Sequence, residues 1–281
     1  MRAGKVTGWV LLTLLTLQAA CGGALTGDAR LSLRHASSGF NLFSPEQDVQ
    51  LGEASAEEIM RQVVVLRDKR TEAYVQRLGE RVAARAPGYR FSYKFVVVDS
   101  PEVNAFALPG GYVFVNRGAV EAARTEGELA GVLAHEVAHV SLRHGTTQAS
   151  RAYLARTAAG LLNTVAGFGQ DDFWRVAAAA FGARTNSFFL RSNREAELQA
   201  DAEGARLMAA AGFDPRDMSD FFERLNERGG ERGVTAASDH PDPASRIEAI
   251  GRVAAALGPA RAHARDSEEF RRIKARLSDL R

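Results

Sequence analysis

The sequence has very little cysteine and no excess of charge. Its single cysteine, Cys21, excludes an intramolecular disulfide. Its 36 lysine and arginine side chains are nearly balanced by 34 aspartate and glutamate side chains, and loss of Arg2 and Lys5 with the first 20 residues would leave 34 of each. This balance argues against nucleic acid as a partner, because nucleic-acid-binding domains usually carry a marked basic excess.

Long apolar runs are also missing after the start of the chain. No later segment reaches the roughly 20 apolar residues that a membrane-spanning helix needs. The Ala- and Gly-rich stretches 153–169 and 173–183 are interrupted by charged side chains, so we predict packed helices there. Because 46% of the 281 residues are hydrophobic, the chain can build the core of one large domain or two small ones.

The first 21 residues resemble a bacterial lipoprotein signal. A basic start is followed by the apolar run WVLLTLLTL, residues 9–17, and small residues then lead to Cys21. Cleavage before Cys21 would make it the first, lipid-modified residue, although Gln18 stands where leucine is usual. The alternative is ordinary cleavage after Ala19 or Ala20, which would release a soluble protein.

These features predict three parts in the chain. We expect a signal peptide over residues 1–20, a flexible tether over 21–43 and a folded domain over 44–281. Gly22, not aspartate, follows the cysteine. By the same resemblance, this favours an anchor in the outer membrane, on the periplasmic side of a bacterial envelope.

The hydrophobic pattern of the domain predicts an α+β fold. Ser44 and Pro45 mark the start of one helix, and a second is expected over about 70–85. Residues 91–98 have the composition of a strand, and 104–118 the pattern of a strand, a Pro-Gly-Gly turn and a strand. The chain is then helical to its end, so we predict a mostly helical fold with a small β-sheet.

The stretch LAGVLAHEVAHVSLRHG, residues 129–145, places His135, Glu136 and His139 in an otherwise apolar helix. His135 and His139 are one turn apart on one face, where two imidazoles can share a tetrahedral Zn²⁺ ion. Glu136 is rotated by about 100° from His135, so it lies near the metal without binding it. It can take a proton from a water molecule that the metal makes more acidic, as in HExxH metallopeptidases.

One candidate for the third ligand that zinc requires is His144. It lies five residues after His139, about 140° around the helix, and does not match the metzincin spacing. Thr125 and Glu128 fit a capping box that starts the helix near residue 126, with a basic end near 144. We therefore predict that His144 interacts with the C-terminal dipole of this helix.

The other candidate is Glu197, which lies on a later helix predicted over 192–215. A carboxylate from a separate helix would complete a site of two histidines and one glutamate, as in gluzincins. Asp201 lies one turn after Glu197, on the same face. It would accept a hydrogen bond from the outer nitrogen of a ligand histidine, most directly His135, and so fix its tautomer.

HEVAH at 135–139 and the E-x-x-x-D of Glu197 and Asp201 together resemble the zinc metallopeptidases of the HtpX and CaaX-prenyl-protease type. Three further stretches agree with this resemblance: FSPEQDVQLG, NAFALPGGYVFVNRG and HPDPASRI. The resemblance covers about residues 44–250 and is closest to small periplasmic lipoproteins of the LoiP and BepA type. It implies a zincin-like α+β domain, with the sheet beside the HExxH helix and one zinc ion per chain.

The chain departs from this family in two respects. Members of the HtpX type have transmembrane helices, which the sequence lacks. In the BepA type a tetratricopeptide domain follows, whereas no 34-residue period is found here. We therefore expect no chaperone domain of that kind.

The resemblance implies a role for His240 and Arg246, which match a family stretch H-P-x-x-x-x-R near the metal. His240 could approach the zinc or stabilise the oxyanion. Arg246 could stabilise the oxyanion or anchor its own loop. The alternative is a plain helix start, with Arg246 in solvent.

Two further segments are predicted to border the cleft. The strand that starts after the turn would be an edge strand, to which an extended substrate adds main-chain hydrogen bonds through Gly110, Gly111, Tyr112 and Val113. Residues 146–190 form an insertion between the ligand helices that could be a helical hairpin lining or covering the cleft. Its Phe173 and Trp174 could touch substrate or lipid, but plain packing explains them better.

The sequence thus predicts a zinc endopeptidase, anchored through a lipid, that cleaves misfolded or misassembled envelope proteins, with Glu136 as general base and then acid. One alternative is an envelope chaperone or assembly factor that uses the same cleft without cleavage. Another is a structural zinc site closed by His240 as fourth ligand. Two imidazoles and a carboxylate suit zinc, and Mn²⁺ and Co²⁺ remain alternatives. The natural substrate and the oligomeric state stay open.

Overall fold

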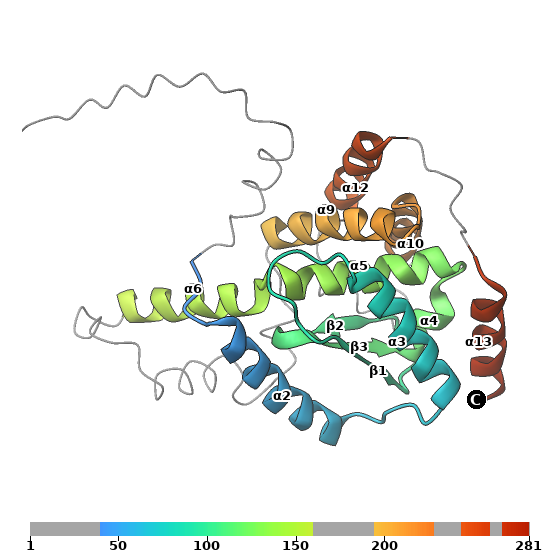
Figure 1. Cartoon of the computed structure of the whole chain (residues 1–281), viewed down its shortest axis with the longest axis horizontal. Coiled ribbons are helices and arrows are strands. Elements are labelled where there is room, and N and C mark those ends of the chain that lie inside the picture. The colour runs from blue at the N-terminus through green and yellow to red at the C-terminus, as the bar shows by residue number, and fades with distance from the viewer. Residues whose placement is uncertain (1–39, 160–193, 228–242, 259–265, 281) are drawn as a thin grey trace, which may run out of the picture. The chain divides into compact units, whose positions relative to one another are not determined.

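The computed structural model describes residues 40–159, 194–227, 243–258 and 266–280, in which helices surround a three-stranded sheet (Figure 1). This confirms the predicted α+β class, mostly helical with a small sheet. None of the described helices is long and apolar enough to cross a membrane. The predicted signal peptide with Cys21, and most of the tether and of the 146–190 insertion, lie outside the described residues.

The two N-terminal helices begin where the sequence places their caps. α2 (Pro45–Gln62) follows Ser44, whose hydroxyl accepts a hydrogen bond from the Gln47 amide while the Gln47 side chain accepts one from the Ser44 amide. α3 (Lys69–Ala83) starts after Asp68, whose carboxylate caps its first turn. Both helices confirm the predicted ones.

The folded domain starts earlier than predicted. Asn41 donates a hydrogen bond from Nδ2 to Thr146 Oγ1 (2.9 Å), and the Leu42 amide donates to Ser150 Oγ (2.9 Å). The Phe43 side chain is buried. These residues pack against the helix that follows the HExxH helix, so placing 41–43 in a flexible tether was wrong. Low apolar content suggested a tether, but it does not reveal such polar contacts.

The sheet consists of β1 (Lys94–Val98), β2 (Ala105–Ala107) and β3 (Tyr112–Asn116), with the 3₁₀ turn η1 (Pro109–Gly111) between β2 and β3. The predicted strand, turn and strand are therefore confirmed. β3 is the central strand of the three. It pairs in parallel with β1 and antiparallel with β2, so that β1 comes from outside the hairpin.

The prediction that the strand after the turn lies at the edge of the sheet was wrong, because this strand, β3, lies between β1 and β2. Tyr112 and Val113 lie in β3, between two strands, and cannot accept a further one. Gly110 and Gly111 form a buried turn against α2, where Gly110 has a φ of 80° and an added Cβ would lie 2.6 Å from Val49 Cα. The sequence pattern of a hairpin does not show on which side a third strand pairs. Here β1 pairs with the side of β3 that was predicted to bind substrate.

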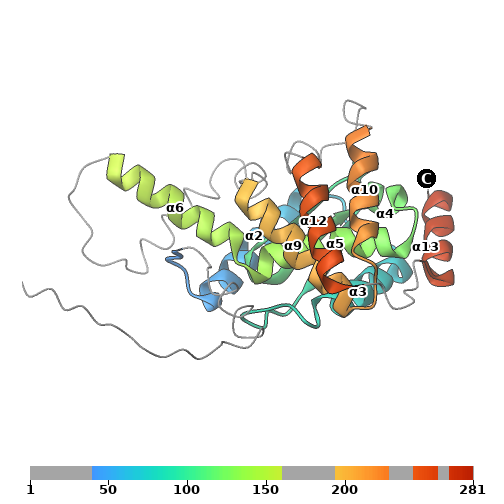
Figure 2. The same cartoon turned by 90° about the horizontal axis from the view of Figure 1, so that it is seen from above.

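Seven helices follow the sheet in the described part of the chain: α4 (Arg117–Ala122), α5 (Glu126–Ser141), α6 (His144–Ala159), α9 (Arg194–Ala210), α10 (Arg216–Glu227), α12 (Pro243–Leu257) and α13 (Glu268–Asp279). α5 is central, because it packs against α3, α9, α10 and β2. Every residue of α5 except His139 is buried, which explains its apolar sequence. α9 lies along α5, and α12 packs against α9 and α10 (Figures 1 and 2).

α9 approaches α5 closely at Gly204. A Cβ added to Gly204 would lie 3.2 Å from the carbonyl carbon of Ala134 and from the amide nitrogen of His135. On the same helix Glu197 and Asp201 are both 0% exposed. The two carboxylates therefore lie on the buried face of α9, and the close helix contact brings that face to the HExxH motif.

α5 ends three residues before the predicted position. Thr125 caps its start by accepting a hydrogen bond from the Glu128 amide, as predicted, although the Glu128 carboxylate bonds to Arg124 instead of closing the capping box. The helix stops at Ser141, and α6 begins at His144. His144 thus starts a new helix, and its predicted interaction with the C-terminal dipole of α5 was wrong.

Candidate metal centre

The candidate metal centre is built from two helices. His135 and His139 lie one turn apart on α5, with their Nε2 atoms 3.0 Å apart. Glu197 reaches both from α9: its Oε2 lies 3.4 Å from His135 Nε2, and its Oε1 lies 3.4 Å from His139 Nε2. The structure therefore brings together the three side chains that the sequence predicted as ligands.

Their spacing fits one tetrahedral zinc ion. Zinc binds histidine nitrogen and carboxylate oxygen at about 2.0–2.2 Å, so two ligand atoms of one tetrahedron lie roughly 3.3–3.6 Å apart. The observed separations of 3.0, 3.4 and 3.4 Å come close to this. Three protein ligands would leave a fourth position for water or substrate, which is typical of catalytic zinc sites.

Asp201 orients His135 by contacting Nδ1, the ring nitrogen that does not face His139 and Glu197. Its Oδ1 lies 2.9 Å from His135 Nδ1, so it can accept that N–H and leave Nε2 to the metal. This is the contact predicted from the sequence. Arg246 on α12 in turn holds Asp201, since its Nε and Nη2 donate to the two carboxylate oxygens at 2.8 Å each.

Arg246 is only 4% exposed, which excludes the solvated alternative. Its Nη1 lies 3.6 Å from Glu197 Oε2. Its guanidinium also lies 4.1 Å from the centre of the Phe222 ring of α10, and that ring meets the His135 ring edge-on at 5.8 Å. These contacts favour an anchoring role for Arg246. No sequence pattern distinguishes Phe222 from an ordinary packing aromatic, so its place beside His135 and Arg246 was not predicted.

A divalent cation would balance the buried charges of the centre. Glu136, Glu197 and Asp201 bring three negative charges, and Arg246, which interacts electrostatically with all three, brings one positive charge. Each of the four is at most 4% exposed. A net charge is costly in such surroundings. A Zn²⁺ ion on neutral imidazoles would make the group neutral, which supports the fit of the residues to zinc.

The two ligand histidines have opposite electrostatic surroundings. Burial and the Arg246 charge lower the pKa of His135, but hydrogen bonds to Asp201 and Glu197 outweigh them and raise this pKa to about 9. Burial lowers the pKa of His139 to about 3. Zinc must therefore compete with a proton on His135, and its affinity should fall as the pH falls.

His144 contacts the second ligand histidine, a neighbour that sequence reasoning did not assign to it. Its Nδ1 lies 3.0 Å from His139 Nδ1, and its Nε2 lies 3.1 Å from Gln199 Oε1 on α9. His144 thus faces the outer nitrogen of His139, not the atoms that would bind zinc. Burial lowers the pKa of His144 to about 4, so its ring is neutral near pH 7.

A family model described as "Peptidase family M48" matches residues 69–254. The chain belongs to peptidase family M48. The match covers all three candidate ligands, Glu136, Asp201 and Arg246. M48 peptidases use zinc, and the cluster of two histidines and one glutamate is positioned to bind it.

Curated relatives of this M48 chain come from bacteria and mitochondria. The beta-barrel assembly-enhancing protease of Escherichia coli (strain K12) is 26% identical over 235 residues, which are 82% of this chain and 48% of that protein. The protein of that name from Yersinia pestis is 28% identical over 213 residues, 73% of this chain and 43% of the relative. The mitochondrial metalloendopeptidase OMA1 of Schizosaccharomyces pombe is 31% identical over 188 residues, 64% and 52% of the two chains. The chain spans about half the length of the curated relatives that it matches.

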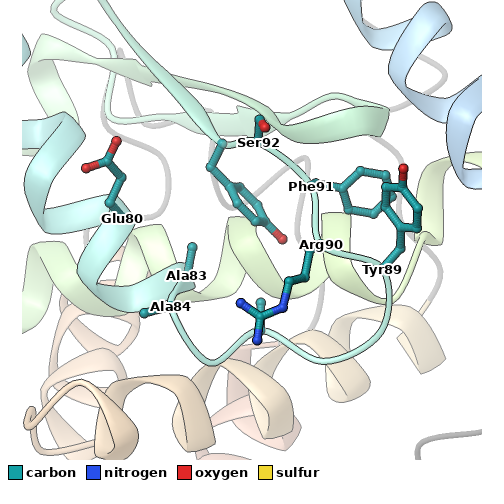
Figure 3. Close-up of a pocket in the computed structure, with 9 residues that line it drawn as sticks. Glu80, Ala83, Ala84, Tyr89, Arg90, Phe91 and Ser92 are labelled. Carbon is teal, nitrogen blue, oxygen red and sulfur yellow. The ribbon is translucent and has the colours of Figure 1, made fainter.

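Other predicted features of the M48 chain are outside the metal centre or outside the described residues. His240 lies outside them, so its predicted approach to the zinc stays a prediction. A shallow pocket of about 460 Å³ lies between the end of α3 and the next loop, where Glu80, Tyr89, Arg90 and Phe91 line it (Figure 3). None of the candidate zinc or substrate residues lines this pocket, so it is not the catalytic cleft.

Replacing Asp201 with asparagine is expected to weaken zinc binding by about 10–100-fold, because the variant loses the charge that orients His135 and pairs with Arg246. Competition with a chromogenic chelator measures the zinc Kd. Glu203→Gln is the matched control, since Glu203 is a buried carboxylate of the same helix whose partner is Arg206. An unchanged zinc Kd in the Asp201 variant would show that this carboxylate does not support the ligand.

Proposed function

We propose that this M48 chain is a zinc-dependent endopeptidase. The observation that carries the proposal is the meeting of Glu197 with His135 and His139 beside Glu136, the arrangement of a catalytic rather than a structural zinc site. A base next to the metal has no use in a site that only holds the fold together. It also has no use in a chaperone that only binds its client.

The proposed reaction divides the work among these side chains. When bound, zinc supplies a Lewis acid that polarises the scissile carbonyl and makes water more acidic. Glu136 accepts the proton of the attacking water and then delivers it to the leaving amine. Asp201 and Arg246 keep His135 in the tautomer and orientation that hold the metal, so they act through the ligand and not on the substrate.

The proposed substrate lies along β2 instead of β3. β2 packs against α5, while the outer side of β1 is partly occupied: the Leu66 amide donates to Val97 O, and the Asp99 amide donates to Val64 O. Antiparallel pairing turns alternate residues toward the partner strand, so the peptide groups of Ala105 and Ala107 point away from β3. An extended segment of an unfolded protein can pair there through main-chain hydrogen bonds, with little demand on its sequence.

The proposed substrates are misfolded or misassembled proteins of the bacterial cell envelope. Support comes from the bacterial relatives, which are named beta-barrel assembly-enhancing proteases, and from the signal-like start of the chain. We propose a periplasmic location on a lipid anchor at Cys21. Replacing Cys21 with serine should then move the protein from the membrane fraction to the soluble fraction. Continued sedimentation of this variant with membranes would exclude the anchor.

Digestion of unfolded casein tests the activity. The zinc-loaded protein should cleave casein within the chain, 1,10-phenanthroline should stop the cleavage, and added zinc should restore it. Cleavage that survives complete removal of the metal would contradict the proposal. So would a protein that holds one zinc per chain and cleaves neither casein nor an unfolded envelope protein.

A further inference from the structure

A chain of four polar side chains leads away from the second ligand histidine. His139 Nδ1 lies 3.0 Å from His144 Nδ1, His144 Nε2 lies 3.1 Å from Gln199 Oε1, and Gln199 Nε2 donates to Glu195 Oε1 at 3.3 Å. His144 lies on α6, and Gln199 and Glu195 lie on α9. The contact between His144 and Gln199 therefore joins α6 to the helix that carries Glu197. None of the three is a predicted ligand or base.

We propose that His144 is a positioning residue that holds His139 in the tautomer and orientation required to bind zinc. The inference rests on the proposed zinc site. If His139 binds zinc through Nε2, its proton sits on Nδ1 and must be donated outward. His144 accepts it at Nδ1, carries its own proton on Nε2 and donates that to the Gln199 carbonyl oxygen. Gln199 donates to Glu195, so each contact in the chain joins one donor to one acceptor.

The two ligand histidines thus have different supports. His135 has a carboxylate, Asp201, whereas His139 has a neutral imidazole. A carboxylate in place of His144 would add a negative charge near Glu197, in a centre that one divalent ion would otherwise neutralise. A neutral acceptor fixes His139 without disturbing that balance.

An ion pair with α2 keeps His144 in place. Arg143, immediately before it, has a φ of 57°, a left-handed conformation that costs free energy in a residue with a side chain. Its Nε and Nη2 donate to the two oxygens of Asp48, at 2.6 and 3.0 Å, and Nη2 also donates to Phe43 O. Asp48 is only 1% exposed. This ion pair holds the turn between α5 and α6, so that α6 begins at His144, the residue that contacts His139.

Zinc affinity, measured by chelator competition in a Glu136→Gln background to prevent self-digestion, tests the proposal. His144→Phe keeps a ring but removes the acceptor, and should raise the zinc Kd by about 10–100-fold. His144→Asn keeps an acceptor and should recover most of the affinity. Leu154→Ala is the control, because Leu154 is an exposed side chain of the same helix, and it should bind zinc like the parent. The unfolding temperature of each metal-free variant shows whether the fold is intact.

The outcomes separate this inference from the proposed function. If the His144→Phe variant binds zinc as tightly as its parent, His144 does not position His139, although the parent is still a zinc protein. If His144→Asn is as weak as His144→Phe with an intact fold, the ring itself matters and the acceptor role is wrong. The Co²⁺-substituted parent and His144→Asn variant should have the same visible spectrum, since a changed coordination number would make His144 a ligand instead. A parent that binds no zinc would remove both proposals.

Discussion

The Glu136→Gln variant is expected to digest casein about 10²–10⁴-fold more slowly than the wild type while still holding one zinc ion per chain. Glutamine has nearly the shape of glutamate but cannot accept the proton of the attacking water. Glu136 is buried on α5 next to His135, and it is not among the three side chains that cluster as ligands. Catalysis should therefore be lost without loss of the metal. Initial rates of casein cleavage and zinc analysis on the same samples measure the two quantities separately.

Glu80→Gln is the matched control for this experiment. It makes the same chemical change at the shallow pocket beside α3, which none of the candidate ligands lines, and should leave the cleavage rate unchanged. A Glu136→Gln variant that cleaves as fast as the wild type would show that another group is the base. If neither wild type nor variant cleaves, and both prevent the aggregation of unfolded proteins equally, the chaperone alternative would replace the protease.

The His135→Ala variant is expected to lose zinc and much of the stability that zinc provides. Two ligands would remain, and the contact of Asp201 with the ring would be gone. Because binding and folding are linked, a wild type with free zinc about a thousandfold above its Kd gains roughly 4 kcal/mol of unfolding free energy. For a domain of this size that corresponds to about 10 °C in Tm.

Tm measured with and without zinc checks this expectation. Zinc should raise the Tm of the wild type and leave that of His135→Ala unchanged, and chelator should bring the wild type near the variant. The variant can lie somewhat below the metal-free wild type, because it also leaves a cavity in the core. Stoichiometric zinc in His135→Ala would show that the metal binds elsewhere.

The residues of the candidate zinc site could be proposed from the sequence because local patterns point to them. Helical spacing places His135 and His139 on one face, and the same spacing places Glu197 and Asp201 on another helix. The contact between Asp201 and His135 follows once the two helices meet, and it was predicted correctly. Cap residues such as Ser44 also fixed where helices begin. Within each helix the decisive residues lie within one or two turns of one another, whereas the pairing of the two helices was inferred from the likeness to gluzincin sites.

The contacts that could not be predicted depend on residues far apart in the chain. α5 ends before His144 because Arg143 pairs with Asp48, which is 95 residues earlier in the sequence. No local stop residue marks that position. The place of β3 in the middle of the sheet depends on β1, which lies outside the hairpin. Arg246 reaches Asp201 from another helix, so only the family resemblance pointed to it.

A crystal structure of the zinc-loaded protein, with anomalous diffraction recorded on both sides of the zinc absorption edge, tests the central claim most directly. One zinc peak per chain should lie about 2.0–2.2 Å from His135 Nε2, His139 Nε2 and a Glu197 carboxylate oxygen. A peak bound to the two histidines with the Glu197 carboxylate out of bonding distance, or a peak elsewhere in the molecule, would contradict it.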